Sequence, residues 1–539
     1  MFRIIYFRLL PHSLIFVVLL WSISRCLYSL DDGTLATDFP GVWGDWSLHV
    51  AHSWWFAEQP FSKWFDARIL RFDSVFSYPP LINFMSGMLL RAGFGLQSAM
   101  LLPCLMFAIL LSLCLPVLFR RAGAGPWTAG ALAVVFILAG GTRTITRLVL
   151  WDFAQPMFEG INTGTLSQVW MTPLFSLLLP QRTLLAGLSL GCAALLVAMD
   201  LKRRTAVSGL RSGPLALTLV MACLLPLLLL AHVHSWLVVM LVIGVIMLLD
   251  FVRSPSVKKD ILRHWVTVVG PGLVISMFLI WATMPAISNK ASGIDWAGFW
   301  RGSETGQSLL FFWIVNWNVV IPLMLVAAAV SREIRSDPFF LSGAIIFIAM
   351  NLVKLQPWAW DNSKLLVWAL LLFGISLVRF FSLHKFRSMS WLAAVIVCID
   401  GLVGLGSQMQ SPAHRLTLWS SGEQAIAAWA RQTLPRDAVI LSPSHLDHRY
   451  WSYALTGRTN VQAYGGWNWT HGFAVEPLQS RVSIMLGDPS VNLASMKGMG
   501  VTHVAVPENV SPIKIGFDGL NRDFKLLGSF ENQALFAVP

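Results

Sequence analysis

Long apolar runs dominate this sequence and constrain its fold more than any other feature. A membrane-spanning helix needs roughly 20 mainly apolar residues, with about 17 as the lower limit. Charged residues make up only 12% of the chain, against roughly 25% in soluble domains. Together these features predict an α-helical polytopic membrane protein with about 11–13 spans. The candidate runs are 13–30, 98–118, 126–141, 183–199, 214–231, 233–250, 265–284, 309–330, 338–354, 365–382 and 389–407.

Two shorter apolar segments, 80–94 and 171–180, begin or end at prolines, and we expect interfacial or re-entrant helices there. If 80–94 does not cross, every strong basic cluster falls on one side, as the positive-inside rule requires. The N-terminus is then cytoplasmic, and the first apolar run is a retained anchor because it lacks a small-residue cleavage site. The clusters are Arg3 and Arg8; Arg120 and Arg121; Lys202, Arg203 and Arg204; Lys258 and Lys259; Arg332 and Arg335; Lys385 and Arg387.

This arrangement places most of the unusual polar residues on the outer face, together with a C-terminal tail. We expect a transmembrane domain over 1–409 and an extracytoplasmic α/β domain over 410–539. The tail pattern predicts a helix at 423–434 and strands at 437–442, 502–507 and 534–539. The net charge of +12 lies in separate clusters and forms no single basic patch, so the composition does not indicate a nucleic-acid partner. The outer loops are 31–79, 142–170, 232–236, 285–307 and 356–364.

The first outer loop contains "GDWSLHVAHSWW" at 44–55, which carries an acid and two imidazoles at helical spacing. Asp45, His49 and His52 stand at i, i+4 and i+7, so they share one helix face. Three interpretations are open for this face. The aspartate can simply favour the helix dipole, the three side chains can bind a divalent metal such as Mg²⁺ or Mn²⁺, or the carboxylate can act as a general base with histidine neighbours.

Three further motifs place polar groups at predicted outer ends of spans. In "WAWDNSK", Asp361 and Lys364 form a local ion pair or aim an ammonium at a phosphate. "HVHSW" puts His232 and His234 between two apolar runs, where ionisable groups indicate function. "PQR" places Arg182 at another outer boundary, where it could contact a lipid phosphate.

The tail segment 444–472 is dense in histidine, arginine and tryptophan. It predicts a loop that faces carbohydrate or membrane, or one that packs its aromatics on the membrane part. "NWT" at Asn468 also matches a glycosylation sequon. The sequence has no Walker-type loop, so ATP-driven transport is unsupported. It also has no soluble nucleotide-sugar domain, so the donor of any transferred group would already lie in the bilayer.

The layout and several short motifs resemble the GT-C superfamily of integral-membrane glycosyltransferases, and most of all its uncharacterised bacterial members. The resemblance implies a GT-C-like fold and transfer of a sugar from a polyprenyl-phosphate-linked donor to a lipid, glycan or protein acceptor. It also implies a multi-pass protein of the bacterial inner (cell) membrane, acting on the extracytoplasmic side. The motifs are "GD…H" (44–49), "YPPL" (78–81), "PQR" (180–182), "H-x-H-S" (232–235), "W-D-N-x-K" (360–364) and "Y-G-G-W-x-W-T-H-G" (464–472).

The resemblance also implies roles for individual residues. Asp45 takes the catalytic position with His49 beside it, and Asp38 is the alternative. Lys364 and Arg182 match basic residues that bind the donor phosphate, and His234 and His232 would assist them. The residues implied to line the substrate cavity are Tyr78, Pro80, Trp360, Asp361, Trp467, Trp469 and His471.

The sequence departs from better-known members of the superfamily in three respects. The tail lacks the Trp-Trp-Asp motif of oligosaccharyltransferases, so glycosylation of asparagine sequons is not expected. No lysine adjoins the "YPPL" motif, and an aspartate pair as in mannosyltransferases is not obvious.

Two other classes of function compete with the enzyme. A lipid or solute transporter, or a flippase, needs polar residues along a path through the membrane, whereas these spans carry little charge and the polar residues gather at one face. A non-catalytic envelope assembly protein would use the outer tail as its working part. The asymmetry of the polar residues favours chemistry at the membrane surface.

Overall fold

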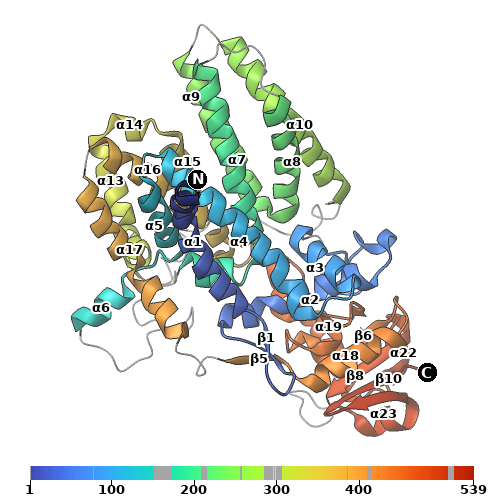
Figure 1. Cartoon of the computed structure of the whole chain (residues 1–539). Helices are drawn as coiled ribbons and strands as arrows, with labels where there is room; N and C mark the ends of the chain where they lie inside the picture. The colour runs from blue at the N-terminus through green and yellow to red at the C-terminus, as the bar shows by residue number, and fades with distance from the viewer. Residues whose placement is uncertain are drawn as a thin grey trace.

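The computed structural model describes residues 2–76, 78–150, 172–207, 215–254, 258–283, 295–296, 298, 306–384, 386–409, 415–507 and 515–539. The chain is mostly helical, with a small sheet domain near its C-terminus (Figure 1). The outer loop expected at 142–170 lies outside the described residues from 151 on, as does most of the loop expected at 285–307. The side chains of Arg3, Arg8, Arg203, Arg204, Lys385 and Arg387 also lie outside them.

The predicted apolar runs coincide with helices, which confirms the helical membrane-protein fold. Within the described residues, six helices are long and apolar enough to cross a membrane, or seven if one bent pair is a single span. The six stretches are Leu96–Arg121, Arg182–Lys202, Val233–Arg253, Lys258–Ala282, Ala359–Leu383 and Met389–Met409. Shorter apolar helices occupy Leu10–Ser24, Leu81–Arg91, Pro126–Ile137, Leu215–Ala231 and Pro338–Leu352.

The apolar run at 309–330, one of the predicted spans, forms two helices. These are α12 (Leu309–Trp317) and α13 (Val320–Val330), which are bent by 114°. Asn318 between them has φ 54° and ψ −131°, a positive-φ backbone that residues with a side chain rarely adopt. Its Nδ2 donates to the carbonyl oxygens of Gly141 at 2.8 Å and Ile396 at 3.1 Å, so neighbouring segments hold the bend in place.

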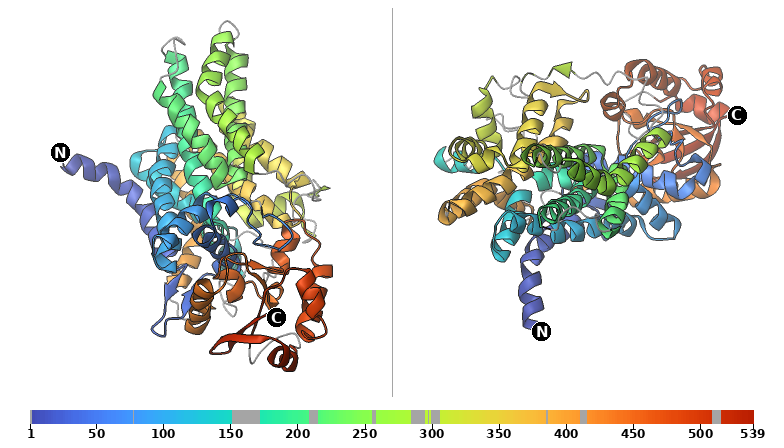
Figure 2. Two further views of the ribbon diagram at one scale, coloured as in Figure 1. Left: turned by 90° about the vertical axis from the view of Figure 1, so that its right-hand side faces the viewer. Right: turned by 90° about the horizontal axis from the view of Figure 1, so that it is seen from above.

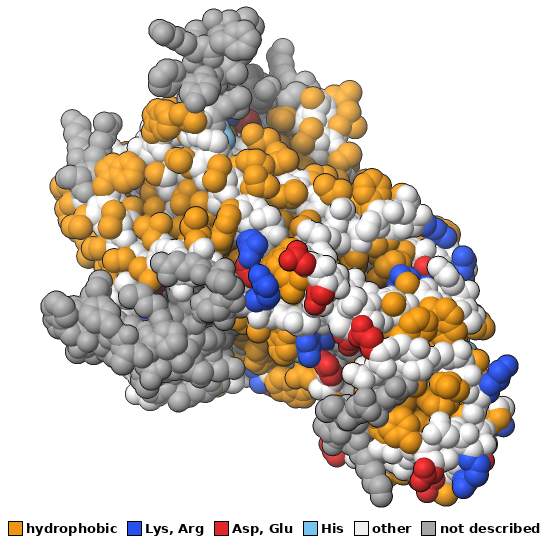
Figure 3. Space-filling view, turned by 60° about the horizontal axis from the view of Figure 1, so that its bottom comes forward, with side chains coloured by type: hydrophobic (Ala, Val, Ile, Leu, Met, Phe, Trp, Pro, Cys, Tyr) orange, Lys and Arg blue, Asp and Glu red, His pale blue; other side chains and the backbone are white. Residues whose placement is uncertain are grey.

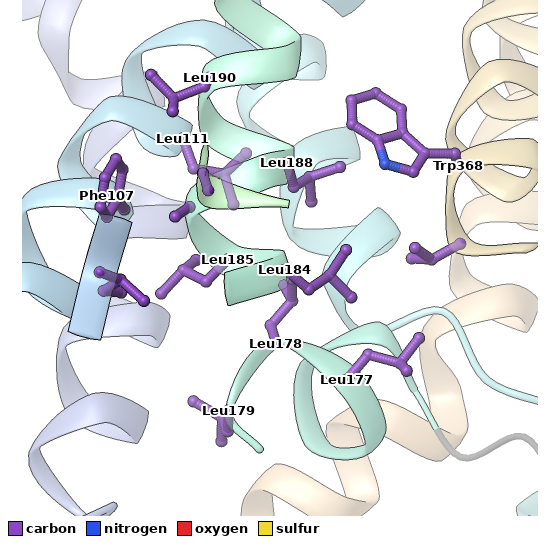
Figure 4. Packing of buried hydrophobic residues seen from close by; sticks show 14 of the residues in the cluster. Phe107, Leu111, Leu177, Leu178, Leu179, Leu184, Leu185, Leu188, Leu190 and Trp368 are labelled. Carbon is purple, nitrogen blue, oxygen red and sulfur yellow. The ribbon is translucent and has the colours of Figure 1, made fainter. Parts of the chain in front are cut away.

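The core lies where α4 (Leu96–Arg121), α7 (Arg182–Val207) and α16 (Ser363–Leu383) meet (Figure 4). Two glycines of α7 permit the close packing. A Cβ on Gly187 would overlap His232, and one on Gly191 would lie 2.5 Å from Trp368 Cη2. The tight packing fixes the ends of the three helices relative to one another. The labelled side chains in this core include Phe107, Leu111, Leu184, Leu185, Leu188, Leu190 and Trp368.

Helices α7 to α10 form a stack that extends past the other helices (Figures 1 and 2). The stack adds α8 (Leu215–Ala231), α9 (Val233–Arg253) and α10 (Lys258–Thr283) to α7. The start of α1 (Phe2–Ser24) projects from the helices, far from the C-terminus in the sheet domain (Figure 2). The remaining long helices of the bundle are α5 (Pro126–Ile137), α15 (Pro338–Leu352) and α17 (Arg387–Met409).

The segments expected to be interfacial or re-entrant are too short to cross. Segment 80–94 forms α3 (Leu81–Arg91) with 11 residues, and 171–180 contains a five-residue π-helix, η2 (Leu174–Leu178). Helix α3 packs tightly on α2 (Pro40–Glu58), because a Cβ on Gly87 would lie 2.5 Å from Phe56 Cβ. Both helices lie at the end of the bundle that the sheet domain covers (Figure 1).

The tail folds as the α/β unit that its pattern predicts. Its mixed sheet has the strand order β7-β6-β8-β10-β9. Strands β7, β6 and β8 are parallel, and β10 runs antiparallel to β8 and β9. Helix α18 (Ser421–Thr433) begins at a capping box of Ser420 and Glu423. The strands are β6 (Val439–Leu441), β7 (Thr459–Asn460), β8 (His503–Pro507), β9 (Lys525–Phe530) and β10 (Gln533–Ala537).

The tail is joined to the first outer segment by main-chain and side-chain bonds. Strand β2 (Leu35–Thr37) pairs with β1 (Tyr28–Ser29) on one side and with β5 (Leu416–Trp419) of the tail on the other. Gln59 Nε2 donates to the carbonyl oxygens of Arg436 at 2.7 Å and Gly457 at 2.9 Å. The tail and the start of the chain therefore form one end of the molecule, and the division at 409/410 stays a prediction.

The visible surface differs between the helices and this end. Hydrophobic side chains cover the helical part, whereas charged side chains gather over the junction and the sheet domain (Figure 3). That distribution suits a membrane around the helices and water around the tail. The side of the membrane on which the tail lies stays a prediction.

Candidate functional site

Helix α2 presents Asp45 to the segment that leads into α7. Pro40 stands at the start of α2, where proline is favoured because the first N–H groups need no helical partner. A Cβ on Gly41 would lie 2.6 Å from Pro180 Cγ, so glycine allows the two segments to meet. Gln181 Nε2 then donates to Asp45 Oδ2 at 2.6 Å. Asp45 lies beyond the first turn of α2, which contains no acidic residue, so the helix dipole does not account for its position.

A second polar group approaches Asp45 from the start of α16. Lys364 Nζ lies 2.8 Å from Asp361 Oδ1, and Asp361 belongs to the 3₁₀ helix η5 (Ala359–Asn362). Asn362 Nδ2 anchors η5 by donating to the carbonyl oxygens of Met350 at 3.0 Å and Val353 at 2.7 Å. The expected local ion pair is therefore present, and it is held at the end of the bundle that carries Asp45.

Burial raises the pKa of Asp45 to about 6, while Lys364 and the Gln181 amide oppose that rise. The carboxyl is mainly ionised at neutral pH and can accept a proton close to it. Tyr78 completes this group: its hydroxyl lies 3.4 Å from Thr183 Oγ1, and both Asp45 and Lys364 act on it electrostatically. Burial raises the pKa of Tyr78, so the phenol is neutral. We call Asp45, Tyr78, Asp361 and Lys364 the charged cluster.

His232 and His234 lie near the charged cluster, with ring centroids 5.2 Å apart and both within electrostatic range of Lys364. His232 caps α9: its Nδ1 accepts from the backbone N–H of Ser235 at 3.2 Å and lies 2.8 Å from Ser235 Oγ. Trp368 Nε1 donates to the same Oγ at 2.9 Å. Because Nδ1 accepts, Nε2 carries the proton of a neutral His232 ring.

Arg182, by contrast, is fully buried, and its donors are occupied. It donates to Ser86 Oγ at 2.6 Å, the Met100 carbonyl at 2.8 Å, Asn83 Oδ1 at 3.2 Å and Cys104 Sγ at 3.2 Å. In the described part of the chain, none of its hydrogen-bond partners is a carboxylate. In this geometry Arg182 therefore has no free N–H group for the expected contact with the phosphate of the sugar donor.

His49 and His52 join Arg182 through one asparagine. His49 Nδ1 lies 3.2 Å from Asn83 Oδ1, and Asn83 Nδ2 lies 3.3 Å from His52 Nδ1. Burial lowers the pKa of His52 to about 3, and burial followed by the nearby Arg182 lowers the pKa of His49. Both rings are therefore neutral. We call His49, His52, Asn83, Ser86 and Arg182 the arginine network.

The arginine network also bears on the metal interpretation of the α2 face. His49 and His52 are bonded to Asn83, whereas Asp45 is bonded to Gln181. Among the residues that the structure describes, no group of three His, Cys, Asp or Glu side chains is placed to hold a metal ion. A need for Mg²⁺ or Mn²⁺ stays a prediction, and the mechanism below uses no metal.

Asp38, the alternative catalytic acid, is 1% exposed and fully bonded. Its Oδ2 lies 2.5 Å from Arg25 Nε, and its Oδ1 accepts from the Tyr28 hydroxyl at 2.5 Å. With both oxygens engaged, Asp38 ties the segment between β2 and α2 to Arg25 and Tyr28 and is not placed to take a proton from a substrate.

The residues expected to line the cavity separate into different environments. Trp360 in η5 and Trp467 are buried, and Pro80 is half-buried at the start of α3. Trp469 is 48% exposed. His471 reaches the charged cluster from the tail, with its ring 5.1 Å from Phe76 and 6.3 Å from Tyr78.

The sequon residue Asn468 is not an acceptor in this fold. It is 1% exposed, and its Nδ2 donates to the carbonyl oxygens of Ala463 at 3.1 Å and Leu70 at 3.3 Å. These bonds fasten the tail to the first outer segment.

Three polar residues of the site were missed in the sequence. Gln181 and Thr183 flank Arg182, and Asn83 follows "YPPL" by two residues. Their only signal was their position beside motifs already noted, since the partners of Gln181 and Asn83 lie far away in the chain.

An apolar cavity of about 250 Å³ lies between α5, α13, α16 and α17. Along α16 its lining begins at Leu370 and includes Leu377 and Phe381, so it starts six residues, or roughly 9 Å at about 1.5 Å per residue, from Lys364. No acidic, basic or histidine side chain lines it, so the chemistry of the site belongs to the charged cluster.

No family model matches this sequence, and no curated protein matches it. Three solved structures of an oligosaccharyltransferase from Archaeoglobus fulgidus are similar to it at 12% identity. The apo form has a TM-score of 0.42 over 99% of this chain and 75% of that chain. The complex with zinc and sulfate has a TM-score of 0.40 over 97% and 73%. The AglB complex with an inhibitory peptide and a dolichol-phosphate has a TM-score of 0.41 over 92% and 69%. Likeness at this distance carries no functional argument, so the function proposed below rests on the site itself.

Proposed function

We propose that this chain is a membrane glycosyltransferase that moves a sugar from a polyprenyl-phosphate-linked donor to an acceptor hydroxyl on the extracytoplasmic side. The observation that carries the proposal is the charged cluster. A carboxyl group with its pKa raised to about 6 and a lysine ammonium influence each other at the end of an apolar helical bundle, under the tail. A base and a cation at the membrane boundary match what a hydroxyl and a lipid phosphate require.

In the proposed reaction, Asp45 accepts the proton of the acceptor hydroxyl while that oxygen bonds to the anomeric carbon of the donor sugar. The bond between this carbon and the phosphate oxygen breaks, and its electron pair stays on the oxygen. The donor phosphodiester carries one negative charge, so a second charge develops on the departing polyprenyl phosphate. Interactions that strengthen as charge develops lower the barrier.

Lys364 is the cation that would stabilise the developing charge. Asp361 holds its ammonium in place at 2.8 Å. His232 would donate from Nε2, because its Nδ1 already accepts from Ser235. His234 lies beside it, and the neutral phenol of Tyr78, near Thr183 Oγ1, adds a polar group to the cluster.

The test is transfer from radiolabelled polyprenyl-phosphate sugars by the purified full-length chain in lipid nanodiscs, with envelope lipids and glycans as acceptors. The wild type should transfer label, and Asp45→Asn should not. Asp31→Asn is the matched control because Asp31 is an exposed carboxylate of the same outer loop. Wild-type protein that transfers from no donor, yet moves a labelled lipid or solute across proteoliposomes, would make the chain a transporter.

A further inference from the structure

The tail contains an open hollow that the proposed chemistry does not use. It has a volume of about 440 Å³, within the range of roughly 300–1,000 Å³ of small-molecule sites. It lies between the 3₁₀ helix η6 (Pro443–His445), α20 (Gly465–Thr470) and α21 (Glu476–Gly487). We call it the tail pocket; its main lining residues are His445, Tyr464, Gly465, Gly466, Trp469 and Gln479.

One wall of the tail pocket carries the buried ring of His445. His445 is 2% exposed, and its Nε2 lies 3.2 Å from Ser483 Oγ. Its Nδ1 makes no hydrogen bond of standard geometry within the described residues, and the backbone of Ser442 lies close enough to act on the ring. Burial lowers the pKa of His445 to about 4, so the ring is neutral at physiological pH. The Nδ1 of a neutral ring either donates or accepts a hydrogen bond, depending on the tautomer. A hydroxyl group can bond to either tautomer because it both donates and accepts.

Another residue that lines the tail pocket offers an exposed aromatic face. Trp469 is 48% exposed. Trp467 on the same short helix is buried instead, with its ring 5.6 Å from Tyr464 and 5.6 Å from Tyr453. One tryptophan therefore anchors the helix while the other is left at the pocket. A flat apolar face beside hydroxyl-binding groups suits a pyranose ring, which has a C–H face and a rim of hydroxyls.

Glycine keeps the floor of the tail pocket open. A Cβ on Gly465 would lie 3.1 Å from Val475 Cγ1 and 3.5 Å from Gln479 Oε1. A Cβ on Gly466 would lie 2.6 Å from Tyr464 Cε1. Any larger residue at 465 would therefore crowd the space beside Gln479, whose amide can both donate and accept.

The tail pocket and the charged cluster lie on two sides of α20. Trp469 lines the pocket, and His471, two residues on, contacts Phe76 and Tyr78. Side chains two residues apart on a helix point in nearly opposite directions, and a helix with its side chains is about 10–12 Å wide. A molecule that occupies both places must therefore extend past one sugar unit.

We propose that the tail pocket binds a saccharide unit of the acceptor, one or more units away from the hydroxyl that reacts at Asp45. This inference rests on the proposed function, and it implies that the acceptor of the transferred sugar is a glycan or a glycolipid. It places recognition of the acceptor in the tail and the chemistry in the charged cluster.

The test is direct binding of fluorescently labelled full-length protein in nanodiscs to an array of defined neutral, amino-sugar and uronic-acid oligosaccharides. The strongest binder on the array is then titrated against the variants. Trp469→Ala and Gly465→Ala should each weaken its binding about tenfold or more. Ile484→Ala should bind as the wild type does, because Ile484 is 61% exposed on the same helix as Gln479 and does not line the pocket.

The Asp45→Asn variant separates this inference from the proposed function. It should bind the oligosaccharide normally and transfer no sugar. Wild-type binding without any transfer would remove the proposed function and leave a saccharide site. Three results would overturn the pocket: no array member binds, binding survives both pocket variants, or Trp469→Ala abolishes adhesion to protein-free liposomes and leaves oligosaccharide binding intact.

Discussion

Two neighbouring regions are built around a basic side chain at the start of a long apolar helix, yet they differ in what surrounds it. In the arginine network, Arg182 is 0% exposed and bonded to neutral acceptors. In the charged cluster, the Lys364 side chain is 14% exposed and paired with Asp361. A guanidinium with five donors can saturate a buried network, whereas an ammonium held by one carboxylate can still take an anion. A basic residue at a span boundary is therefore not by itself a phosphate ligand.

The sharpest way to break this comparison is Asp45→Asn. We expect transfer to fall about 10²- to 10⁴-fold, the usual range for removing a general base. The fold should not weaken. Because burial raises the folded-state pKa of Asp45, its neutral form is the more stable one, and ionisation costs stability as pH rises through about 6. The neutral amide avoids that cost. In the Asp45→Asn variant the transfer rate should therefore fall, while the thermal midpoint should stay unchanged or rise.

Lys364→Gln should lower kcat about 10²-fold or more, since it removes the cation proposed to meet the developing phosphate charge. The single variant leaves Asp361 unpaired, so Lys364→Gln with Asp361→Asn is the matched control. If the double variant regains wild-type kcat, the lysine serves only to neutralise Asp361. If it remains slow, the charge itself is needed.

Arg182→Gln should act on stability instead. It leaves Ser86 and the Met100 carbonyl buried without their donor, at about 1–3 kcal/mol for each unsatisfied group. The thermal midpoint, followed by tryptophan fluorescence in nanodiscs, should fall. The remaining folded protein should keep its KM for the donor. If instead the KM for the sugar donor rises and the thermal midpoint does not change, Arg182 binds the donor phosphate. The arginine network and the charged cluster would then have the same role.

The dependence of activity on pH gives the smallest expected effect of these tests of the charged cluster. Activity should rise about tenfold per pH unit below the pKa of the base and level off above about 6, because Asp45 must be ionised to accept a proton. Gln181→Leu removes the amide that stabilises the carboxylate, so it should move this inflection to higher pH. Ile484→Ala, far from α2 in the chain and exposed on α21, should leave the inflection in place.

The sequence predicted those features that depend on local pattern. Apolar runs are local, so the helices and the tail strands overlap their predicted places, although α1 begins 11 residues before its predicted run and α7 ends eight residues after its own. The bend at Asn318 was missed, because it depends on carbonyls of Gly141 and Ile396, which are remote in the chain. The sequence therefore predicted the apolar run at 309–330 but not its division into two helices.

The candidate site was predictable in its residue types but not in its bonding. The i, i+4, i+7 spacing on α2 placed Asp45, His49 and His52 on one face, and the structure keeps them on one helix. Their partners were not readable, since Gln181 lies 136 residues from Asp45 and Asn83 lies 34 residues from His49. Bonding separates the two aspartates, since Asp38 is engaged through both oxygens by Arg25 and Tyr28 whereas Asp45 accepts from Gln181, and no pattern in the sequence reports this difference. The catalytic and phosphate-binding roles themselves stay proposals.

The pairing of β2 with β5 has a consequence for biosynthesis. Leu35 faces Trp419 in that pairing. Strand β2 is therefore synthesised early but cannot complete its pairing until β5 has been synthesised, after α17. Until then the N–H and C=O groups on one edge of β2 are unpaired and can form hydrogen bonds with a strand of another chain. A nascent chain that stalls before residue 416 would therefore expose an adhesive strand, a feature that cellular quality control could recognise.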